Sequence, residues 1–583
     1  MIKEAIFHQP MNQYAYHYDD GTVHIMIQSR AYDLKNVQLI WADPYNFKEE
    51  TWQYELTEVK HSGRTKTLDY WKIEIKPPYR RMRYGFRCEG ANGEVTYLTG
   101  KGHYTKPPEE INAYFCLPYI HKVDAFKAPA WVKDTVWYQI FPERFGNGDP
   151  SLSPENAYNW DEKVPESKDF FGGDFQGILN HLDYLEELGI NGIYLCPIFK
   201  AGSNHKYDTI DYFEIDPQFG DKETFRKLVD QCHERGIKVM LDAVFNHSGY
   251  YFEPFQDVLK NNEQSPYKDW FHIWDFPVQT TPYPNYDTFA FVSNMPKLNT
   301  ANPEVKDYLL KVARYWIEEF NIDGWRLDVA NEIDHEFWRA FRKEVKSANP
   351  DVYILGEVWH DSMPWLRGDQ FDAVMNYPFT ENVLELFDGT SSVSYFKDQM
   401  MHLLHMYPDH VQDVQFNLLD SHDTARIKTL VRGEKERVKL MYAFQLTFLG
   451  SPCLYYGDEI GLEGGEEPES RGCMIWDEEK QDLDLLHFVK QLIELRKSNP
   501  ALGAYGQFKF IDADEASGVL VYSKENDAEQ FVIVMNTTAN DQTIDMPTAL
   551  NKRAEPLFTE KNISQSDGRM KLEPFAFGIY KRH

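Results

Sequence analysis

The sequence predicts an α/β protein whose central domain is a (β/α)8 TIM barrel, flanked by an N-terminal and a C-terminal β-sandwich domain. Eight short apolar runs alternate with helical stretches between about residues 132 and 504. Strands that alternate with helices favour a parallel barrel with the helices outside. Residues before and after this region are typical of strands joined by turns. We therefore expect domains at 1–123, 124–504 and 505–583.

The first domain is predicted from its alternation of apolar and polar residues. Residues 23–27 and 71–75 alternate in this way, as half-buried strands do. The pairs Asn92-Gly93 and Ser62-Gly63 favour turns. Residues 123–131 then break the alternation with a proline and small residues, which predicts a linker into the barrel.

The barrel strands are expected from near-continuous apolar runs, because parallel barrel strands are buried on both faces. The runs are 134–141, 190–196, 237–245, 324–329, 352–358, 373–377, 415–420 and 452–456. The clearest helix opens at Asn302-Pro303, an N-cap followed by proline, and carries an apolar stripe of Val305, Leu309, Val312 and Trp316.

Two regions lie outside this alternation. Residues 247–300, between the third and fourth strands, are rich in Phe, Tyr and Pro. So long a gap inside a compact domain indicates a functional loop or a small subdomain. After about residue 504 the runs 519–522 and 531–535 predict the C-terminal β-sandwich.

Bulk properties exclude some classes of partner. Lys+Arg 61 against Asp+Glu 92 gives a net charge of −31, which argues against nucleic acid and anionic membranes and suits a neutral oligosaccharide. The six scattered cysteines form no CxxC pair and are expected to be buried free thiols in a reducing compartment. The start resembles no secretion signal, and no stretch is apolar enough to span a bilayer. We expect a cytoplasmic protein.

Polar residues close several of the apolar runs. Arg326 and Asp328 are two residues apart, so both side chains point to the same side of a strand. We expect Arg326 to keep Asp328 ionised, and an ionised carboxylate can attack carbon. Glu357 and Asp423 close two further strands. Three acids at the carboxyl ends of barrel strands predict acid/base and nucleophilic chemistry on a sugar bond.

The alternative is that each of these polar groups has only a structural role. For a single Asp or His at a strand end that alternative is favoured. It is disfavoured for the set, because the polar ends of four strands meet at one rim.

Six segments carry a resemblance to a known family. Residues 242–247, 324–328, 356–359 and 419–423 resemble, in this order, the four signature regions of the α-amylase family. Residues 295–299 (Met-Pro-Lys-Leu-Asn) and 329–332 (Val-Ala-Asn-Glu) resemble its neopullulanase, cyclomaltodextrinase and maltogenic amylase subgroup, as does the β domain ahead of the barrel.

The resemblance implies retaining hydrolysis of α-1,4-glucosidic bonds in cyclodextrins, maltooligosaccharides and pullulan, with accompanying transglycosylation. It makes Asp328 the nucleophile that forms a covalent glycosyl-enzyme, Glu357 the general acid and then base, and Asp423 the residue that stabilises the transition state. The implied substrate-binding residues are Tyr207, His247, Arg326, His422, Phe289, Trp359, Glu467 and Arg471. Core packing is an equal alternative for Phe289 and Trp359, and Glu467 stands where the family often has Asp.

The resemblance also implies a metal and a partner. Asn147, Asp149, Gly172 and Asp174 are similar to a calcium site of the subgroup. Calcium prefers oxygen ligands. However, Leu152 and Ser153 stand where Asn and Asp are expected, so a plain turn is the alternative. No organic cofactor is implied. The subgroup forms homodimers through the N-terminal domain, and Trp41 and Tyr45 are candidates to reach the partner's site.

Two other functions stay open at this point. One is a glucanotransferase or isomerase on the same scaffold, which would share the covalent intermediate. The other is an inactive carbohydrate-binding protein, which the presence of all three acids disfavours.

Overall fold

The protein, seen in a computed structural model, is described for residues 1–514, 516–550 and 554–582. These residues form two compact units, one of residues 1–127, 363–369 and 394–412, the other of the remaining residues. The second unit holds an eight-stranded parallel sheet in the order β20-β19-β18-β17-β14-β13-β22-β21. A parallel bridge between Met375 and Phe416 joins its two ends and closes the barrel.

All eight predicted strands are confirmed, each within one of the expected runs or one residue beyond it. They are β13 (Trp137–Ile140), β14 (Gly192–Leu195), β17 (Lys238–Ala243), β18 (Gly324–Leu327), β19 (Tyr353–Gly356), β20 (Ala373–Val374), β21 (Phe416–Leu418) and β22 (Ser451–Tyr455). Every residue of seven of them is buried, and the eighth, β17, has only its first residue half-buried. Burial on both faces explains why the runs are continuous rather than alternating.

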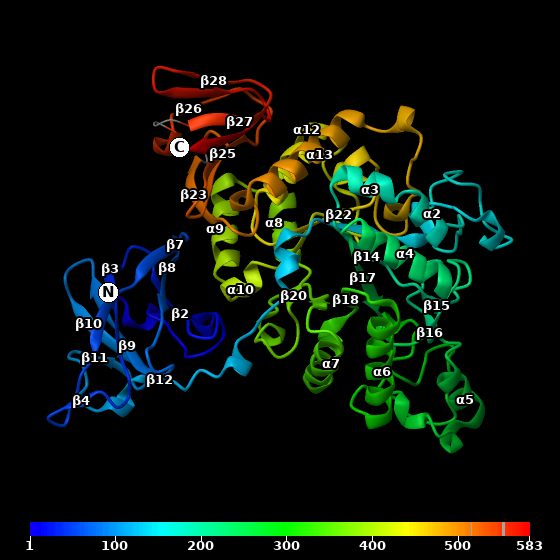
Figure 1. The fold of residues 1–583 in the computed structure, drawn as a ribbon, viewed down its shortest axis with the longest axis horizontal. Coiled ribbons are helices and arrows are strands. Elements are labelled where there is room, and N and C mark those ends of the chain that lie inside the picture. The colour runs from blue at the N-terminus through cyan, green and yellow to red at the C-terminus, as the bar shows by residue number, and fades with distance from the viewer. Residues whose placement is uncertain (515, 551–553, 583) are drawn as a thin grey trace. The chain divides into compact units, whose positions relative to one another are not determined.

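Helices surround the barrel strands (Figure 1). They are α1 (Pro142–Phe145), α2 (Phe175–Asn180), α3 (Leu182–Leu188), α4 (Lys222–Glu234), α6 (Pro303–Phe320), α7 (His335–Ala348), α8 (Tyr377–Phe387), α11 (Ile427–Leu430), α12 (Lys435–Leu446) and α13 (Leu483–Ser498). A hairpin of β15 (Phe199–Ala201) and β16 (Thr209–Ile215) lies between β14 and β17 in the chain.

The predicted start of α6 is confirmed. The Asn302 side chain accepts hydrogen bonds from the backbone N–H groups of Glu304 and Val305, which satisfies two donors that the helix itself cannot use. The predicted stripe of Val305, Leu309, Val312 and Trp316 is buried.

The N-terminal domain is a β-sandwich, as predicted. One sheet has the order β1 (Ala15–His17), β2 (Val23–Arg30), β8 (Leu68–Ile75) and β7 (Lys60–Arg64). The other runs β11 (Gly102–Tyr104), β10 (Val95–Thr99), β9 (Met82–Gly90), β3 (Leu34–Ala42) and β6 (Glu55–Glu58), with β12 (Phe115–Leu117) also paired to β9. The short strands β4 (Phe47–Lys48) and β5 (Thr51–Trp52) form a separate hairpin.

The prediction of a turn at Ser62-Gly63 was wrong. Both residues lie inside β7, where the register against β8 shifts between His61 and Gly63. Glycine at a bulge marks a close approach of other atoms. A Cβ on Gly63 would overlap the Met401 side chain.

The same unit contains α9 (Val393–Leu404) from its second residue and α10 (Asp409–Gln412). Asp409 pairs with Lys72 of β8, and with His24 of β2 at 3.0 Å. Tyr70 of β8 stacks on His405 with ring centroids 4.2 Å apart. The first sheet of the N-terminal domain is thus attached to a stretch that follows it by more than 300 residues in the chain.

The insertion and the C-terminal domain complete the second unit. Residues 247–300 contain α5 (Glu253–Asn261) and three short 3-10 turns, Asn262–Gln264, Lys268–Trp270 and Phe289–Phe291. The Phe255 ring lies 5.0 Å from that of Phe271 and 5.1 Å from that of Tyr286, centroid to centroid, so the insertion has a small aromatic core.

The C-terminal domain has two sheets, which confirms the predicted β-sandwich. The strands are β23 (Gln507–Asp514), β24 (Val519–Glu525), β25 (Gln530–Asn536), β30 (Phe577–Arg582) and β27 (Ala554–Glu560), then β26 (Gln542–Asp545), β29 (Arg569–Leu572) and β28 (Ile563–Ser566). Residues 515, 551–553 and 583 of the predicted domain lie outside the described part of the chain.

All six cysteines are free thiols, as predicted. Five are buried, but Cys116 is exposed because it lies on β12, whose middle residue faces outward. Among the described helices, none combines the length and the apolar character needed to cross a bilayer.

Candidate active site

Arg326 is the centre of the carboxylate cluster. It lies on β18, in register with Asp242 on the neighbouring β17, and both side chains are buried. Its Nη1 donates to Asp242 at 3.0 and 3.1 Å and to Asp328 Oδ1 at 2.7 Å. Its Nη2 forms an ion pair with Glu357 Oε1 at 2.8 Å. One guanidinium therefore holds three carboxyl groups from three neighbouring strands.

Glu357 has two further donors. The backbone N–H of Val329 donates to its Oε2 at 2.8 Å, and Trp359 Nε1 donates to its Oε1 at 3.3 Å. Val329 adopts a left-handed backbone conformation with φ of 45°, which is rare for a β-branched residue. This turn directly after Asp328 aims the N–H group at Glu357, so the two acids are linked through the chain as well as through Arg326.

The charge balance of the cluster favours protonation. Burial raises the pKa of Asp328 well above its ordinary value, Arg326 lowers it, and Glu357 and Asp242 raise it further. Burial likewise raises the pKa of Asp242 to about 6, against the effect of Arg326. Arg326 thus favours the ionised form of Asp328, as expected, but burial and the two neighbouring acids oppose this effect. One cation is shared by three acids.

Tyr207 and His422 form a hydrogen-bonded chain to Asp242. Gln139 Nε2 lies 2.7 Å from His422 Nδ1, and His422 Nε2 lies 2.5 Å from the Tyr207 hydroxyl. If the Gln139 amide donates to Nδ1, Nε2 carries the ring proton and donates to the Tyr207 oxygen. The Tyr207 hydroxyl then donates to Asp242 Oδ2 at 3.0 Å.

Burial lowers the pKa of His422 well below its ordinary value, so the ring is neutral at neutral pH. Burial also lowers the pKa of His247 to about 3. Both predicted histidines are therefore neutral hydrogen-bonding groups rather than cations.

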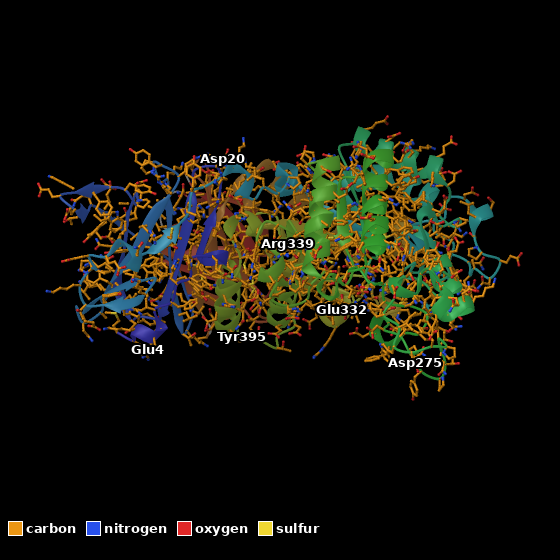
Figure 2. All side chains as sticks on the ribbon, turned by 90° about the horizontal axis from the view of Figure 1, so that it is seen from below. Glu4, Asp20, Asp275, Glu332, Arg339 and Tyr395 are labelled. Carbon is orange, nitrogen blue, oxygen red and sulfur yellow. The ribbon has the colours of Figure 1, made fainter. Side chains whose placement is uncertain are left out.

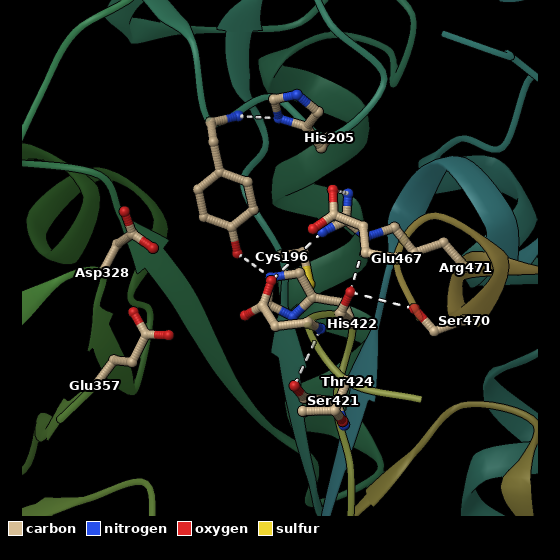
Figure 3. A network of polar contacts seen from close by, with 12 residues as sticks. Cys196, His205, Asp328, Glu357, Ser421, His422, Thr424, Glu467, Ser470 and Arg471 are labelled. Atoms are coloured by element: carbon tan, nitrogen blue, oxygen red, sulfur yellow. Dashed lines mark hydrogen bonds and ion pairs between the residues drawn. The ribbon is translucent and has the colours of Figure 1, made fainter. Parts of the chain in front are cut away.

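Asp423 lies on the loop that follows β21. It is 3.3 Å from His422 Nε2 and accepts a hydrogen bond from Arg471 Nη2 at 3.4 Å. Arg471 Nη1 pairs with Glu467 at 2.8 Å, so Glu467 is a partner of that arginine. Figure 3 shows Asp328 and Glu357 on one side of the view and the residues around His422 and Arg471 on the other.

Two predicted aromatic residues also lie at this rim. The Phe289 ring stacks on His247 with centroids 5.0 Å apart. The Trp359 ring stacks on Tyr377 with centroids 3.6 Å apart and planes 7° apart, and Trp359 is 42% exposed. Half-exposure with an N–H aimed at Glu357 favours a site role for Trp359 over core packing.

The four residues with a possible calcium role do not fit a calcium ion as they stand. Both carboxylate oxygens of Asp174 accept backbone N–H groups, from Gly148, Asp149 and Gly177. Asn147 donates its amide to Ser153, and Asp149 accepts from Ser151. A Cβ on Gly172 would crowd Asn147 and Ser153. Calcium needs six to eight oxygen ligands, and here the acid oxygens already serve a turn and the start of α2.

Sequence reasoning gave no role to several residues of the cluster. Asp242 lies one residue before the end of β17, and Glu357 lies one residue after the end of β19, so a search for acids near the strand ends would also have selected Asp242. Tyr194, which donates to Asp242 at 2.6 Å, and Tyr377 have no such signal, because each is one aromatic residue within an apolar run.

Comparison with known proteins decides the family. Residues 139–505 match the α-amylase catalytic domain, residues 1–121 the α-amylase N-terminal Ig-like domain, and residues 508–579 the maltogenic amylase C-terminal domain. This chain belongs to the α-amylase family. It is a glycoside hydrolase with the three-domain organisation that its sequence predicted.

Relatives in the α-amylase family align over almost the whole chain. The chain is 56% identical over 585 residues to a cyclomaltodextrinase of Geobacillus thermopakistaniensis, covering 100% of this chain and 99% of the relative. It is 48% identical to an intracellular maltogenic amylase of Bacillus subtilis (97% and 96% covered). It is 43% identical to neopullulanase 2 of Thermoactinomyces vulgaris (98% and 98% covered).

Solved structures of the family agree. A cyclomaltodextrinase superposes with a TM-score of 0.94 at 47% identity, covering 100% of both chains. A cyclic α-maltosyl-(1→6)-maltose hydrolase of Arthrobacter globiformis, in complex with that cyclic sugar, superposes with a TM-score of 0.72 at 38% identity. It covers 78% of this chain and 100% of its own.

Proposed function

We propose that this protein is a retaining hydrolase of α-1,4-glucosidic bonds in cyclodextrins and maltooligosaccharides, with pullulan as a further substrate. The names of its relatives support the substrate class. The observation that carries the mechanism is Arg326, whose two terminal nitrogens hold Asp328 at 2.7 Å and Glu357 at 2.8 Å. Two acids on one guanidinium are neighbours, and retaining glycosidases need the closer spacing of about 5–5.5 Å.

In the first step Glu357 donates its proton to the glycosidic oxygen while the Asp328 carboxylate attacks the anomeric carbon. The bond between that carbon and the oxygen breaks, and the leaving sugar departs with a new hydroxyl group. Asp328 then carries the glycosyl group as an ester. Asp423, held by Arg471, is placed to bind hydroxyls of the same sugar.

In the second step Glu357 is a carboxylate and removes a proton from water as the water oxygen attacks the anomeric carbon. The ester bond breaks and Asp328 is released as a carboxylate. Arg326, Val329 and Trp359 place donors on both oxygens of Glu357, which orients its carboxylate for this step. A sugar hydroxyl in place of water would give transglycosylation.

The cluster also suits the charge that develops during the reaction. With Asp242 and Asp328 ionised and Glu357 protonated, as the first step requires, Arg326 leaves the group with a charge of −1 in a buried setting. An oxocarbenium-like transition state is positive and offsets that excess. The repulsion that raises the pKa values of Asp328 and Asp242 in the free enzyme is thus relieved when the glycosidic bond breaks.

We also propose that two copies associate through the N-terminal domain. Tyr45 is 74% exposed and Phe47 is 50% exposed, one just before β4 and the other in it. Trp41, the other candidate from the sequence, is half-buried and therefore less exposed than Tyr45. Its indole N–H donates to Thr57. Large aromatic side chains in water favour a protein interface. Sedimentation of the whole protein and of a variant lacking residues 1–123 would measure the assembly.

We propose a cytoplasmic location, in line with two relatives of Bacillus subtilis that are named intracellular. Oligosaccharides imported into the cell would be the substrates.

The test of the function is turnover of β-cyclodextrin, maltotriose and pullulan, side by side, with the products followed by proton NMR. We expect opening of β-cyclodextrin and an α-anomer as the first product. A β-anomer as first product would contradict retention, and absence of turnover on all three would contradict the proposed function. Products longer than the substrate at high maltotriose would measure transglycosylation against hydrolysis.

A further inference from the structure

Lys297 lies in the insertion, and its ammonium group has three oxygen partners. Its Nζ donates to Asn246 Oδ1, to the Glu332 carbonyl at 3.0 Å and to Glu332 Oε2 at 3.4 Å. An ammonium group has three hydrogens to donate, so each has an acceptor within the protein. The side chain is 19% exposed. Lys297 is therefore engaged inside the protein and is not a free cation for the substrate.

The partners of Lys297 belong to two segments at the carboxyl ends of barrel strands. Asn246 follows β17, and Glu332 ends the 3-10 turn Ala330–Glu332, four residues after Asp328. Around Lys297 the backbone also pairs with the end of β17. Leu298 N donates to Asn246 O at 3.0 Å, and Ser248 N donates to Pro296 O at 3.1 Å.

The same stretch of the insertion supports the turn that carries Phe289. Phe289 N donates to Met295 O at 3.0 Å, and Thr288 bridges to Pro296. Phe289 stacks on His247 at the rim. Figure 2 labels Glu332 and, on the insertion, Asp275, both in the lower part of the molecule as drawn. Lys297 thus connects the Phe289 turn to the turn that follows the nucleophile.

We infer that Lys297 is a positioning residue that holds the Phe289 turn and the Ala330–Glu332 turn against β17, and thereby sets the preference for cyclic over short linear substrates. The inference rests on the proposed function. A cyclic glucan cannot straighten, so it contacts more of the rim while its bond lies between Asp328 and Glu357. A short linear substrate can place its bond there with fewer rim contacts.

The test replaces Lys297 by methionine, which has similar length and no ammonium group. We expect kcat/KM for β-cyclodextrin to fall about 10- to 100-fold, because displacing a positioned group by about 1 Å has effects of this size. We expect less than about a threefold fall for maltotriose. Lys260→Met is the matched control, since Lys260 is an exposed lysine on α5 of the same insertion. Glu332→Gln keeps the backbone acceptor, so its effect should be smaller and should not add to that of Lys297→Met.

A second readout separates this inference from the proposed function. Hydrogen exchange of the whole protein should be faster in Lys297→Met over residues 286–298 and 329–333, and unchanged in Lys260→Met. Unchanged exchange there, or an equal loss on both substrates, would overturn the inference. A wild-type protein that leaves β-cyclodextrin intact would instead overturn the proposed function, and the exchange result would still decide the role of Lys297.

Discussion

Two buried or half-buried ionic clusters in this molecule have opposite ratios of acids to bases. In the N-terminal unit, Asp409 alone faces both Lys72 and His24. Burial raises the pKa of Asp409, but the two basic partners lower it by more, so it lies well below its ordinary range. At the barrel rim a single Arg326 serves Asp242, Asp328 and Glu357, and burial with mutual repulsion raises the pKa of Asp242 to about 6.

The difference separates a stabilising group from a reactive one. Asp409 is ionised and satisfied, so it holds the N-terminal sheet to α10. The rim cluster keeps unrelieved negative charge in a buried place, which costs folding free energy and is offset only when a positive transition state forms. A charge balance that would be a defect in a structural core is thus the basis of the proposed chemistry.

The largest expected effect comes from removing the nucleophile. Asp328→Asn should lower kcat on β-cyclodextrin by about 10⁴-fold or more, because the amide cannot form the glycosyl ester. The unfolding midpoint should not fall, since the like-charge repulsion at the cluster decreases. Asp275→Asn, on the insertion, is the control and should keep full activity. Wild-type turnover by purified Asp328→Asn would show that Asp328 is not the nucleophile and that the rim cluster is not the reactive group.

Arg326→Met should have the next largest effect. With the cation gone, the pKa values of Asp328 and Asp242 rise, and kcat should fall about 10²- to 10³-fold. The free energy of unfolding at pH 7 should drop by about 3–5 kcal/mol. The deficit should shrink toward pH 5, because a carboxyl group whose folded-state pKa is raised destabilises the protein only above its unfolded pKa. Urea unfolding at both pH values measures this, and a deficit independent of pH would contradict the shared-cation account.

Asp242→Asn should move the acidic side of the pH–activity profile. The charge of Asp242 raises the pKa of Asp328, so its removal lets Asp328 ionise at lower pH. The acidic limb of kcat/KM should shift down by about one pH unit. The maximum should also fall, about 10- to 100-fold, because Tyr207 and Arg326 lose a charged acceptor. A shift to higher pH would mean that repulsion by Asp242 does not raise the pKa of Asp328.

Asp409→Asn should affect stability rather than activity. Its lowered pKa contributes stability above the unfolded value of 3.8, which is lost as the pH falls through the folded value. The variant should therefore lose about 1–2 kcal/mol at pH 7, a modest figure because the side chain is 34% exposed. The loss should be smaller near pH 3, and kcat/KM should stay within about twofold. An activity loss as large as that of Asp242→Asn would remove the distinction between the two groups.

The smallest effect is expected from chelation. Since the oxygens of Asp174 are used by backbone N–H groups, EDTA should shift the thermal midpoint by less than about 1 °C and leave the rate unchanged. A midpoint that falls by several degrees and returns with added calcium would show that Asn147, Asp149 and Asp174 rearrange to bind the ion.

Much of this organisation was predictable because local patterns determine it. The barrel strands are continuous apolar runs, and polar residues such as Glu357 stand where each run closes. Alternation predicted both β-sandwiches, and Asn302 with Pro303 predicted the start of α6. These signals are local, and the known order of barrel strands then places their ends together.

Other features depend on neighbours that are distant in sequence. Ser62-Gly63 has the composition of a turn, yet β7 continues there as a bulge because Met401 and His405 lie against Gly63. The pairing of Asp409 with His24 spans 385 residues. The strained turn at Val329 and the raised pKa of Asp242 arise from packing and shared charge, which no single segment contains.

The central claim is that Asp328 carries the glycosyl group during turnover. A maltosyl fluoride slowed by a second fluorine beside the reaction centre should leave an ester long-lived enough for peptide mass spectrometry. The account predicts one added fluoromaltosyl mass, because only the anomeric fluoride leaves, on the peptide that contains Asp328 and on that residue itself, with loss of the adduct when maltose is added as acceptor. An adduct on Glu357 or Asp423, or turnover of the fluoride with no adduct at any residue, would contradict it.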